Sequence, residues 1–345
     1  MSLYGRDLIT TQEWEKWELE EALDLAAAMK RERFSDRWTA VLQHRTFIMF
    51  FYNPSVRTRI SFEAAMTEMG GHSQFLTPSA GRFKTSKTAG ETIEDAARVM
   101  ARFAAGIGIR ILEDKVPYYG AGTELLREYA HWANVPILNM ADDRFHPFQG
   151  LADLMGWAEW YGEGPGRPHY RALQGKKFVL TWAQGALARS WCSVQEALLI
   201  ASRFGMNVTV ARPDGYDLDP EVIHWTQSNC EEHGTDFEVT DNPSASLDGA
   251  HIVYARNWMS PHGYQDGEFK KQREIEKAMK IEGWTLDAAK MARTDNAIFT
   301  HPMPVDRGNE VTDEVASGPR SVIYDVAENR LHVQKAVMAL TMGDL

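Results

Sequence analysis

Short apolar runs alternate with longer segments that carry apolar residues at helical spacing, and this alternation constrains the fold more than any other feature. Apolar runs that read as strands lie at residues 46–52, 73–76, 106–110, 135–140, 177–182, 207–211, 237–239, 251–254 and 297–300. Strands that alternate with helices form parallel sheets covered by helices on both faces. The sequence therefore predicts an α/β protein with two doubly wound parallel-sheet domains.

The segments between these runs supply the helices. We expect helices over residues 13–30, 61–69, 91–104, 122–133, 193–204, 219–233 and 328–340. Thr11 is expected to cap the first of them, and the charged run Glu268–Lys280 to form a solvent-exposed helix face. The turn after Trp182 lacks a Gly-x-Gly-x-x-Gly pattern, which disfavours a nicotinamide-dependent dehydrogenase.

Composition limits the partners. The chain has 345 residues, 44% of them hydrophobic, which is enough for two domains with real cores. Its net charge of -11 argues against nucleic acid or an anionic membrane surface as a partner, so a basic site would be a local pocket for a small anionic metabolite. Two cysteines, no apolar signal core and no apolar run of about 20 residues predict a soluble cytoplasmic protein.

The turn that follows the first apolar run carries the clearest chemical signal. Asn53-Pro54 ends the run, and Ser55-Val56-Arg57-Thr58-Arg59 then leads into a helix. Hydroxyls, guanidiniums and the N–H groups of a helix N-terminus together are suited to holding a phosphate. The alternative is an ordinary helix with a basic first turn, although helices prefer carboxylates there.

A second motif lies at His146-Pro147-Phe148-Gln149. Pro147 suits the first position of a helix, and residues three apart project from the same side of it. A histidine that merely caps this helix is the alternative. Residues 77–90 have no periodicity and are expected to form a mobile loop, while Arg110 should lie at the end of a buried strand.

Together these motifs resemble the aspartate/ornithine carbamoyltransferase family over nearly the whole chain. The motifs are Ser55–Glu63, His146–Asp153, and His301-Pro302-Met303-Pro304 with Arg307-Gly308. The ending Ala327–Ala336 resembles the ornithine side of the family. Three stretches, 51–55, 254–258 and 325–338, are similar to the N-acylornithine branch, whose chain is knotted. The long turn after Trp182 fits a trefoil knot in the second domain.

The resemblance implies a carbamoyltransferase (EC 2.1.3.-) that uses carbamoyl phosphate and serves arginine biosynthesis. It implies that carbamoyl phosphate is bound by Ser55, Val56, Arg57, Thr58, Arg59, Arg110, His146, Gln149 and Arg330. The residues implied to be catalytic are Thr58, Arg110, His146, Gln149 and Arg330. No metal and no organic cofactor are implied.

The resemblance places the acceptor amine at Arg256, Trp258, His301, Pro302 and Met303, although core packing is an alternative role for Trp258. An ornithine-like amine, either ornithine or an N-acylornithine, is expected. The Ser-Met-Gly loop of ornithine enzymes is missing, and Pro302 stands where they have cysteine. Glu310 stands where acetylornithine enzymes have lysine. Aspartate or another amine is thus an alternative acceptor, and a catalytically silent carbamoyl-phosphate-binding protein is the alternative from another class.

The resemblance also predicts the assembly and the division of the chain. Family members are typically trimers in which a loop reaches the neighbouring active site. Here the candidates for that reach are Phe83, Lys84, Ser86 and Lys87, with an ordinary surface loop as the alternative. We expect a carbamoyl-phosphate-binding domain at 1–145, an amino-acid-binding domain at 146–324, and a C-terminal helix at 325–345 that returns to the first domain.

Overall fold

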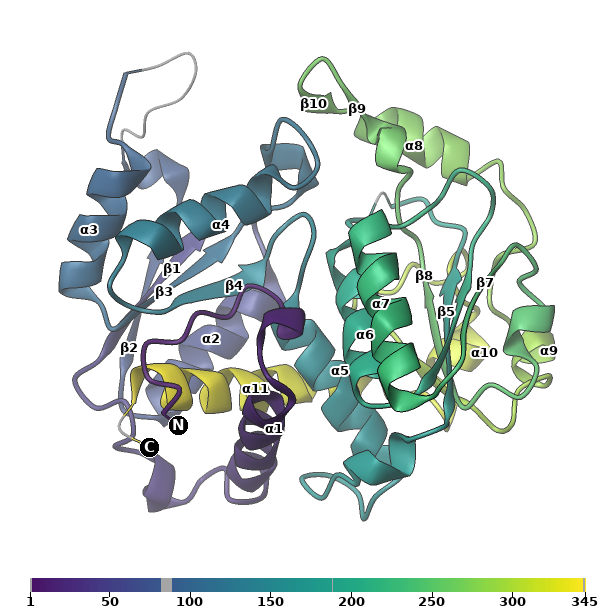
Figure 1. Ribbon diagram of the computed structural model, residues 1–345, viewed down its shortest axis with the longest axis horizontal. Coiled ribbons are helices and arrows are strands. Elements are labelled where there is room, and N and C mark those ends of the chain that lie inside the picture. Colours follow the sequence, from purple (N-terminus) through teal and green to yellow (C-terminus); the bar gives the residue numbers. More distant parts are fainter. Residues whose placement is uncertain (1, 82–88, 188, 344) are drawn as a thin grey trace. The chain divides into compact units, whose positions relative to one another are not determined.

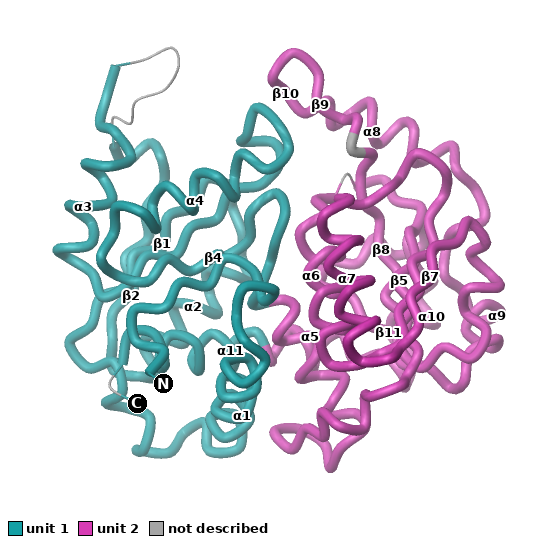
Figure 2. Tube along the Cα trace, viewed as in Figure 1, with its two compact units in different colours: residues 1–148, 330–345 teal, residues 149–329 magenta. Residues whose placement is uncertain are grey.

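The computed structural model describes residues 2–81, 89–187, 189–343 and 345. Its chain divides into two compact units (Figure 2). Unit 1 contains residues 1–148 and 330–345, and unit 2 contains residues 149–329. Each unit is built on a parallel sheet, so the predicted α/β architecture with two parallel sheets is confirmed.

Unit 1 is built on a four-stranded sheet in the order β2-β1-β3-β4 (Figure 1). The strands are β1 (Thr46–Phe51), β2 (His72–Leu76), β3 (Gly106–Arg110) and β4 (Ile137–Ala141). Its helices are α1 (Lys16–Arg31), α2 (Val56–Glu68), α3 (Ile93–Phe103) and α4 (Ala121–Trp132), together with the first two residues of α5 (Pro147–Trp160) and most of α11 (Ile323–Met342).

Alternate residues of β1 face opposite layers of helices. The Phe47 ring stacks 5.5 Å from Phe62 of α2, whereas the Phe50 ring lies 6.4 Å from Tyr129 of α4. This is the period-2 alternation of a strand that is buried on both faces. Full burial of each such side chain contributes roughly 1.5–3 kcal/mol to folding.

Unit 2 contains a five-stranded parallel sheet in the order β11-β8-β5-β6-β7. Its strands are β5 (Lys177–Trp182), β6 (Asn207–Ala211), β7 (Phe237–Thr240), β8 (Ile252–Arg256) and β11 (Ile298–Thr300), and a small hairpin is formed by β9 (Tyr264–Gln265) and β10 (Glu268–Phe269). The remaining helices are α6 (Cys192–Arg203), α7 (Pro220–His233), α8 (Lys271–Ala278), α9 (Ala288–Met291) and α10 (Asp313–Ala316).

The sheet of unit 2 is also covered on both faces. Phe178 of β5 packs against Trp157 of α5, with ring centroids 4.9 Å apart. Its neighbour Val179 points the other way, into a cluster that includes Val315 and Ala316 of α10. The alternation therefore places helices on both sides of the strand.

Several predicted element ends were wrong, and local capping explains some of them. The helix predicted from residue 61 begins at Val56, because Ser55 caps it, and the last helix begins at Ile323 instead of 328. The helix predicted from residue 13 begins at Lys16, where Glu15 and not Thr11 is the N-cap, and Thr10 caps the short 3-10 turn before it. The charged run is not wholly solvated, since Glu274 is buried and accepts a hydrogen bond from the Ser260 N–H.

Strand β8 continues two residues beyond its predicted end, to Arg256. The register of β5 and β8 pairs Trp182 with Arg256, so this arginine lies at the carboxyl end of the sheet. Among the described residues, no helix has both the length and the apolar character needed to cross a membrane.

Candidate active site

The N-terminus of α2 forms the first part of the candidate site. The Ser55 hydroxyl accepts a hydrogen bond from the Thr58 N–H at 3.3 Å, which is the geometry of an N-cap. The first turn contains no acidic residue. Because the first N–H groups of a helix have no partners within the helix and its dipole favours negative charge, this helix start is suited to an anion.

The three predicted residues after Val56 have different surroundings. Arg57 is exposed, and Thr58 is buried. The Arg59 guanidinium lies 3.9 Å from the centre of the Phe75 ring and pairs with Glu63 at 2.9 Å. Arg57 and Arg59 are therefore both exposed cations of the first turn, and Arg59 contacts Phe75 and Glu63.

The turn before α2 is attached to the end of β3. The Asn53 side-chain oxygen accepts from the Leu112 N–H at 2.7 Å, and its amide donates to Asp114. Arg110, the last residue of β3, is half-buried and donates from Nη1 to the Met140 carbonyl at 3.3 Å. The carboxyl ends of β1, β3 and β4 thus bring the Ser55 turn and Arg110 to one edge of the sheet.

Arg330 reaches the same helix from the other end of the chain. It lies on α11, is largely buried, and donates from Nη2 to the Thr58 hydroxyl at 3.4 Å. Residues 272 positions apart in sequence are thereby brought into contact within unit 1. This contact joins the C-terminal motif to the phosphate-type motif.

His146 and Gln149 flank the first turn of α5. His146 is buried and immediately precedes Pro147, the first residue of the helix, as the sequence predicted. Gln149, the first residue of unit 2, donates from Nε2 to Asp153 at 3.0 Å. Because a carboxylate only accepts, this contact fixes the Gln149 amide with its oxygen directed away from Asp153.

The loop that leads to His146 is held by two buried carboxylates. Asp142 accepts from the Arg144 N–H and the Thr123 hydroxyl, both at 2.8 Å. Asp143 accepts from the N–H groups of Gly120 and Gly122 at the start of α4. Burial raises the pKa of both carboxyl groups, and these hydrogen bonds oppose the rise.

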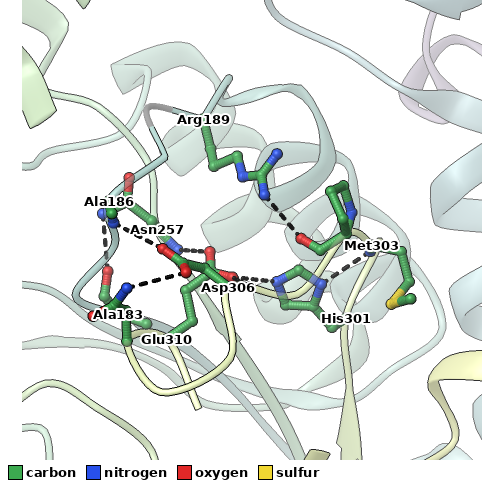
Figure 3. A network of polar contacts seen from close by, with 10 residues as sticks. Ala183, Ala186, Arg189, Asn257, His301, Met303, Asp306 and Glu310 are labelled. Carbon is green, nitrogen blue, oxygen red and sulfur yellow. Dashed lines mark hydrogen bonds and ion pairs between the residues drawn. The ribbon is translucent and has the colours of Figure 1, made fainter. Parts of the chain in front are cut away.

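Two of the predicted acceptor residues, His301 and Met303, belong to a network in unit 2 that is centred on Glu310 (Figure 3). Glu310 is fully buried and accepts from His301 Nε2 at 3.0 Å and from the N–H groups of Asn257 and Asp306 at 2.8 Å. His301 Nδ1 accepts from the Met303 N–H at 2.9 Å. Both ring nitrogens of His301 therefore have partners within the protein.

The other predicted acceptor residues differ in burial and in hydrogen bonding. Trp258 is fully buried, and its ring N–H donates to the Tyr216 carbonyl at 2.9 Å, so it packs in the core of unit 2. Pro302 is buried and Met303 half-buried. The Arg256 guanidinium is buried, yet its Nε and Nη1 atoms have no hydrogen-bond partner among the described residues.

Sequence reasoning missed three groups that hold these residues. Asp153 could have been found, because it follows Gln149 by four positions on one helix. Glu310 was noted only as a departure from a family pattern, and its role as the centre of a network has no signal in sequence spacing. Glu68, which contacts Lys335 at 3.0 Å, was also missed.

The loop candidates Phe83, Lys84, Ser86 and Lys87 lie outside the described residues. Within the described part of the chain, no three His, Cys, Asp or Glu side chains are grouped so that they could hold a metal ion.

Comparison with known families assigns one description to each part of the chain. Residues 6–159 match the family model "Aspartate/ornithine carbamoyltransferase, carbamoyl-P binding domain". Residues 175–341 match "Aspartate/ornithine carbamoyltransferase, Asp/Orn binding domain". The two matches together cover nearly the whole chain.

Individual relatives are similar over their full length. The ornithine carbamoyltransferase of Thermococcus kodakarensis is 36% identical over 345 residues, covering 100% of this chain and 99% of the relative. The N-acetylornithine carbamoyltransferase of Xanthomonas campestris is 32% identical, with 98% of each chain covered. A crystal structure of acetylornithine transcarbamylase complexed with acetylcitrulline superimposes with a TM-score of 0.88 at 32% identity, covering 98% of this chain and 100% of that chain.

Proposed function

Because the chain belongs to the aspartate/ornithine carbamoyltransferase family, we propose that the residues around the start of α2 bind carbamoyl phosphate and activate it for transfer. The protein is a carbamoyltransferase of ornithine or N-acetylornithine type that uses carbamoyl phosphate. The observation that supports the site most directly is the hydrogen bond from Arg330 to Thr58, which joins the two ends of the sequence at this helix start.

The phosphate end of the donor would lie at the N-terminus of α2. Ser55, Val56, Arg57, Thr58 and Arg59 supply this part of the site. Backbone N–H groups and the helix dipole favour the negative charge, and a guanidinium donates charge-assisted hydrogen bonds. Arg57 is exposed, so its guanidinium is accessible to a phosphate. Arg59 would first have to leave Glu63, or would act through its charge.

The carbamoyl end would be polarised by Thr58, Arg110, His146, Gln149 and Arg330. The uncharged amine attacks the carbonyl carbon, and negative charge develops on the carbonyl oxygen. Donors that are already in place stabilise this charge without reorganisation. The bond from carbon to the phosphate oxygen then breaks, and phosphate leaves with the electron pair. No covalent enzyme intermediate is required.

The acceptor must lose a proton before it attacks. An alkyl ammonium has a pKa of about 10.4, so at neutral pH most of the amine is protonated. That proton leaves to solvent before attack. In our proposal the departing phosphate takes a second proton, which the nitrogen loses once its bond to the carbonyl carbon has formed. His301 is poorly suited to act as the base, since Glu310 and the Met303 N–H occupy its two nitrogens.

We propose that unit 2 binds the acceptor, with Arg256 as its main polar contact. A buried guanidinium whose Nε and Nη1 have no protein partner among the described residues is suited to a carboxylate, which every α-amino acid carries. His301, Pro302 and Met303 would shape the adjoining wall, and Trp258 would support it from the core. Free ornithine and N-acylornithine are both candidates, since relatives of both kinds are similar to this chain.

The experiment is an acceptor panel. Purified protein with carbamoyl phosphate is offered ornithine, N-acetylornithine, N-succinylornithine, aspartate or putrescine, and the ureido product is measured. We expect turnover with an ornithine-like member. Product from aspartate alone would favour that alternative. Binding of carbamoyl phosphate without product from any amine would support the catalytically silent alternative.

Three further expectations remain predictions. In the first, the family's trimer would form, with Phe83, Lys84, Ser86 and Lys87 as the candidates for reaching a neighbouring site, and analytical ultracentrifugation would test the oligomer. In the second, the 183–191 segment would form part of a trefoil knot. Its support is that Asn257 donates to the Ala183 carbonyl and Trp191 to that of Met259, which places the two segments together. A crystallographic chain trace without the crossing would refute the knot. In the third, the protein would act in the cytoplasm.

A further inference from the structure

An ion pair joins α11 to α2 at a second point, away from Arg330. Lys335 Nζ donates to Glu68 Oε2 at 3.0 Å, and the Lys335 side chain is fully buried. Arg33, which follows α1, donates to Glu68 Oε1 from Nη2 at 2.7 Å and from Nε at 3.1 Å. One carboxylate therefore connects three helical segments of unit 1.

Glu68 is suited to this role by its ionisation. Burial alone would raise its pKa, but the hydrogen bonds and charges of Arg33 and Lys335 outweigh burial and lower the pKa. Glu68 is thus ionised at neutral pH. A buried ammonium without a paired carboxylate is strongly disfavoured, so separating Lys335 from Glu68 would be destabilising.

The same two helices meet at Thr58 and Arg330. Arg330 and Lys335 are five residues apart on α11, which separates them by about 7.5 Å along the helix and by about 140° around it. Thr58 lies in the first turn of α2, and Glu68 is its last residue. Two attachments at different heights and angles restrict both sliding and rotation of α11.

We propose that Glu68 is a positioning residue for Arg330: through Lys335 it sets the register of α11 on α2 and so holds the Arg330 guanidinium against Thr58. This inference rests on the proposed function, in which Arg330 stabilises the carbonyl oxygen. Glu68 lies at the opposite end of α2 from Ser55 and acts on catalysis only through the helix. The hydrogen bond from Arg330 to Thr58 is long, at 3.4 Å, so a small displacement of α11 on α2 would break it.

A double-mutant cycle tests the coupling. Glu68→Gln keeps the size of the side chain but removes its charge, and a displacement of Arg330 should lower kcat about 10- to 100-fold. In an Arg330→Ala background the same substitution should change kcat less than twofold, because no guanidinium is left to position. Lys335→Met provides a second variant, which keeps the Arg33 contact and should couple to Arg330 in the same way.

Glu18→Gln is the matched control. Glu18 is a buried glutamate of unit 1, and it contacts Arg6 and the N–H of Glu15 instead of α11. It should lower stability without any coupling to Arg330. Independent effects of Glu68 and Arg330 on kcat, or a normal kcat in Glu68→Gln and Lys335→Met, would overturn the inference.

Hydrogen exchange gives a second readout that does not need turnover. Amides of α11 around Arg330 should exchange faster in Glu68→Gln than in Glu18→Gln, and equal protection would overturn the inference. Absence of product from wild-type protein would count against the proposed function. Normal wild-type turnover with an additive cycle would count against Glu68 alone.

Discussion

Glu310→Gln removes one charge from the centre of unit 2 while it keeps the shape of the side chain. No orientation of the new amide serves all the donors. If its NH2 group takes the place of Oε1, it faces the Asn257 N–H, and if it takes the place of Oε2, it faces the Asp306 N–H. An unsatisfied buried donor costs about 1–3 kcal/mol, so one of these two segments should loosen.

The pKa of Glu310 supplies an independent magnitude. Burial would raise this pKa, but His301, the Arg256 charge and the Asp306 N–H outweigh it and lower the pKa from 4.5 to about 2. The difference corresponds to about 3 kcal/mol of folding stability at pH 7. A lowered carboxyl pKa stabilises the fold above the unfolded value of 4.5, and this contribution is lost as pH falls toward 2. About 1 kcal/mol should remain at pH 3.

Urea unfolding monitored by circular dichroism measures the free energy of unfolding at pH 7 and at pH 3. Glu310→Gln should be less stable than wild type by about 3 kcal/mol at pH 7, and the gap should narrow at pH 3. Glu314→Gln, a change at an exposed glutamate of α10, is the control. Its free energy of unfolding should stay within about 0.5 kcal/mol of the wild-type value at both pH values. A gap below 1 kcal/mol at pH 7, or the same gap at both pH values, would refute this account of Glu310.

Arg57→Ala should remove most of the affinity for carbamoyl phosphate and leave the free energy of unfolding within about 0.5 kcal/mol, because Arg57 is exposed; titration calorimetry with an unchanged Kd would contradict the assignment. The contribution of Asp142 and Asp143 to the free energy of unfolding should fall as pH rises from about 4 to about 7, because burial raises the pKa of both carboxyl groups and the folded state then holds protons that the unfolded state has released. Urea titrations at several pH values would show this contribution as a slope of the free energy of unfolding against pH, and Asp143→Asn should change that slope. The same slope in the variant and in wild type would argue against this role of Asp143. Arg256→Gln should raise the KM of the acceptor about 10- to 100-fold without changing the KM of carbamoyl phosphate; equal effects on both would argue against a carboxylate contact.

The strands were predictable because burial on both faces leaves a continuous apolar run in sequence. Residues 106–110, 177–182 and 207–211 were predicted with the bounds that the structure shows. Helix ends were harder, since they depend on single hydrogen bonds. Ser55 caps α2 by accepting a hydrogen bond from the Thr58 N–H, and the spacing of apolar residues does not indicate that hydrogen bond. The start of α2 was therefore placed five residues too late.

The site was predictable only in part, because its motifs are local and the contacts between them are not. Ser55–Arg59 and His146–Gln149 could be recognised as phosphate-type and helix-start motifs from residue types alone. That Arg330 belongs with Thr58 came only from the family resemblance, because 272 residues separate them. The Glu68–Lys335 pair spans 267 residues and had no motif to mark it.

The acceptor was the least predictable feature, and the Glu310 network explains why. A motif such as His301-Pro302-Met303 suggests side chains that face a ligand, yet the two nitrogens of His301 and the two oxygens of Glu310 are occupied within the protein. His301 and Glu310 can therefore influence an acceptor by holding the segments around it rather than by hydrogen bonds to it. Arg256 differs, because two of its donor atoms have no partner among the described residues. Specificity should therefore respond more to the charge and reach of residue 256 than to the histidine motif by which the family is recognised.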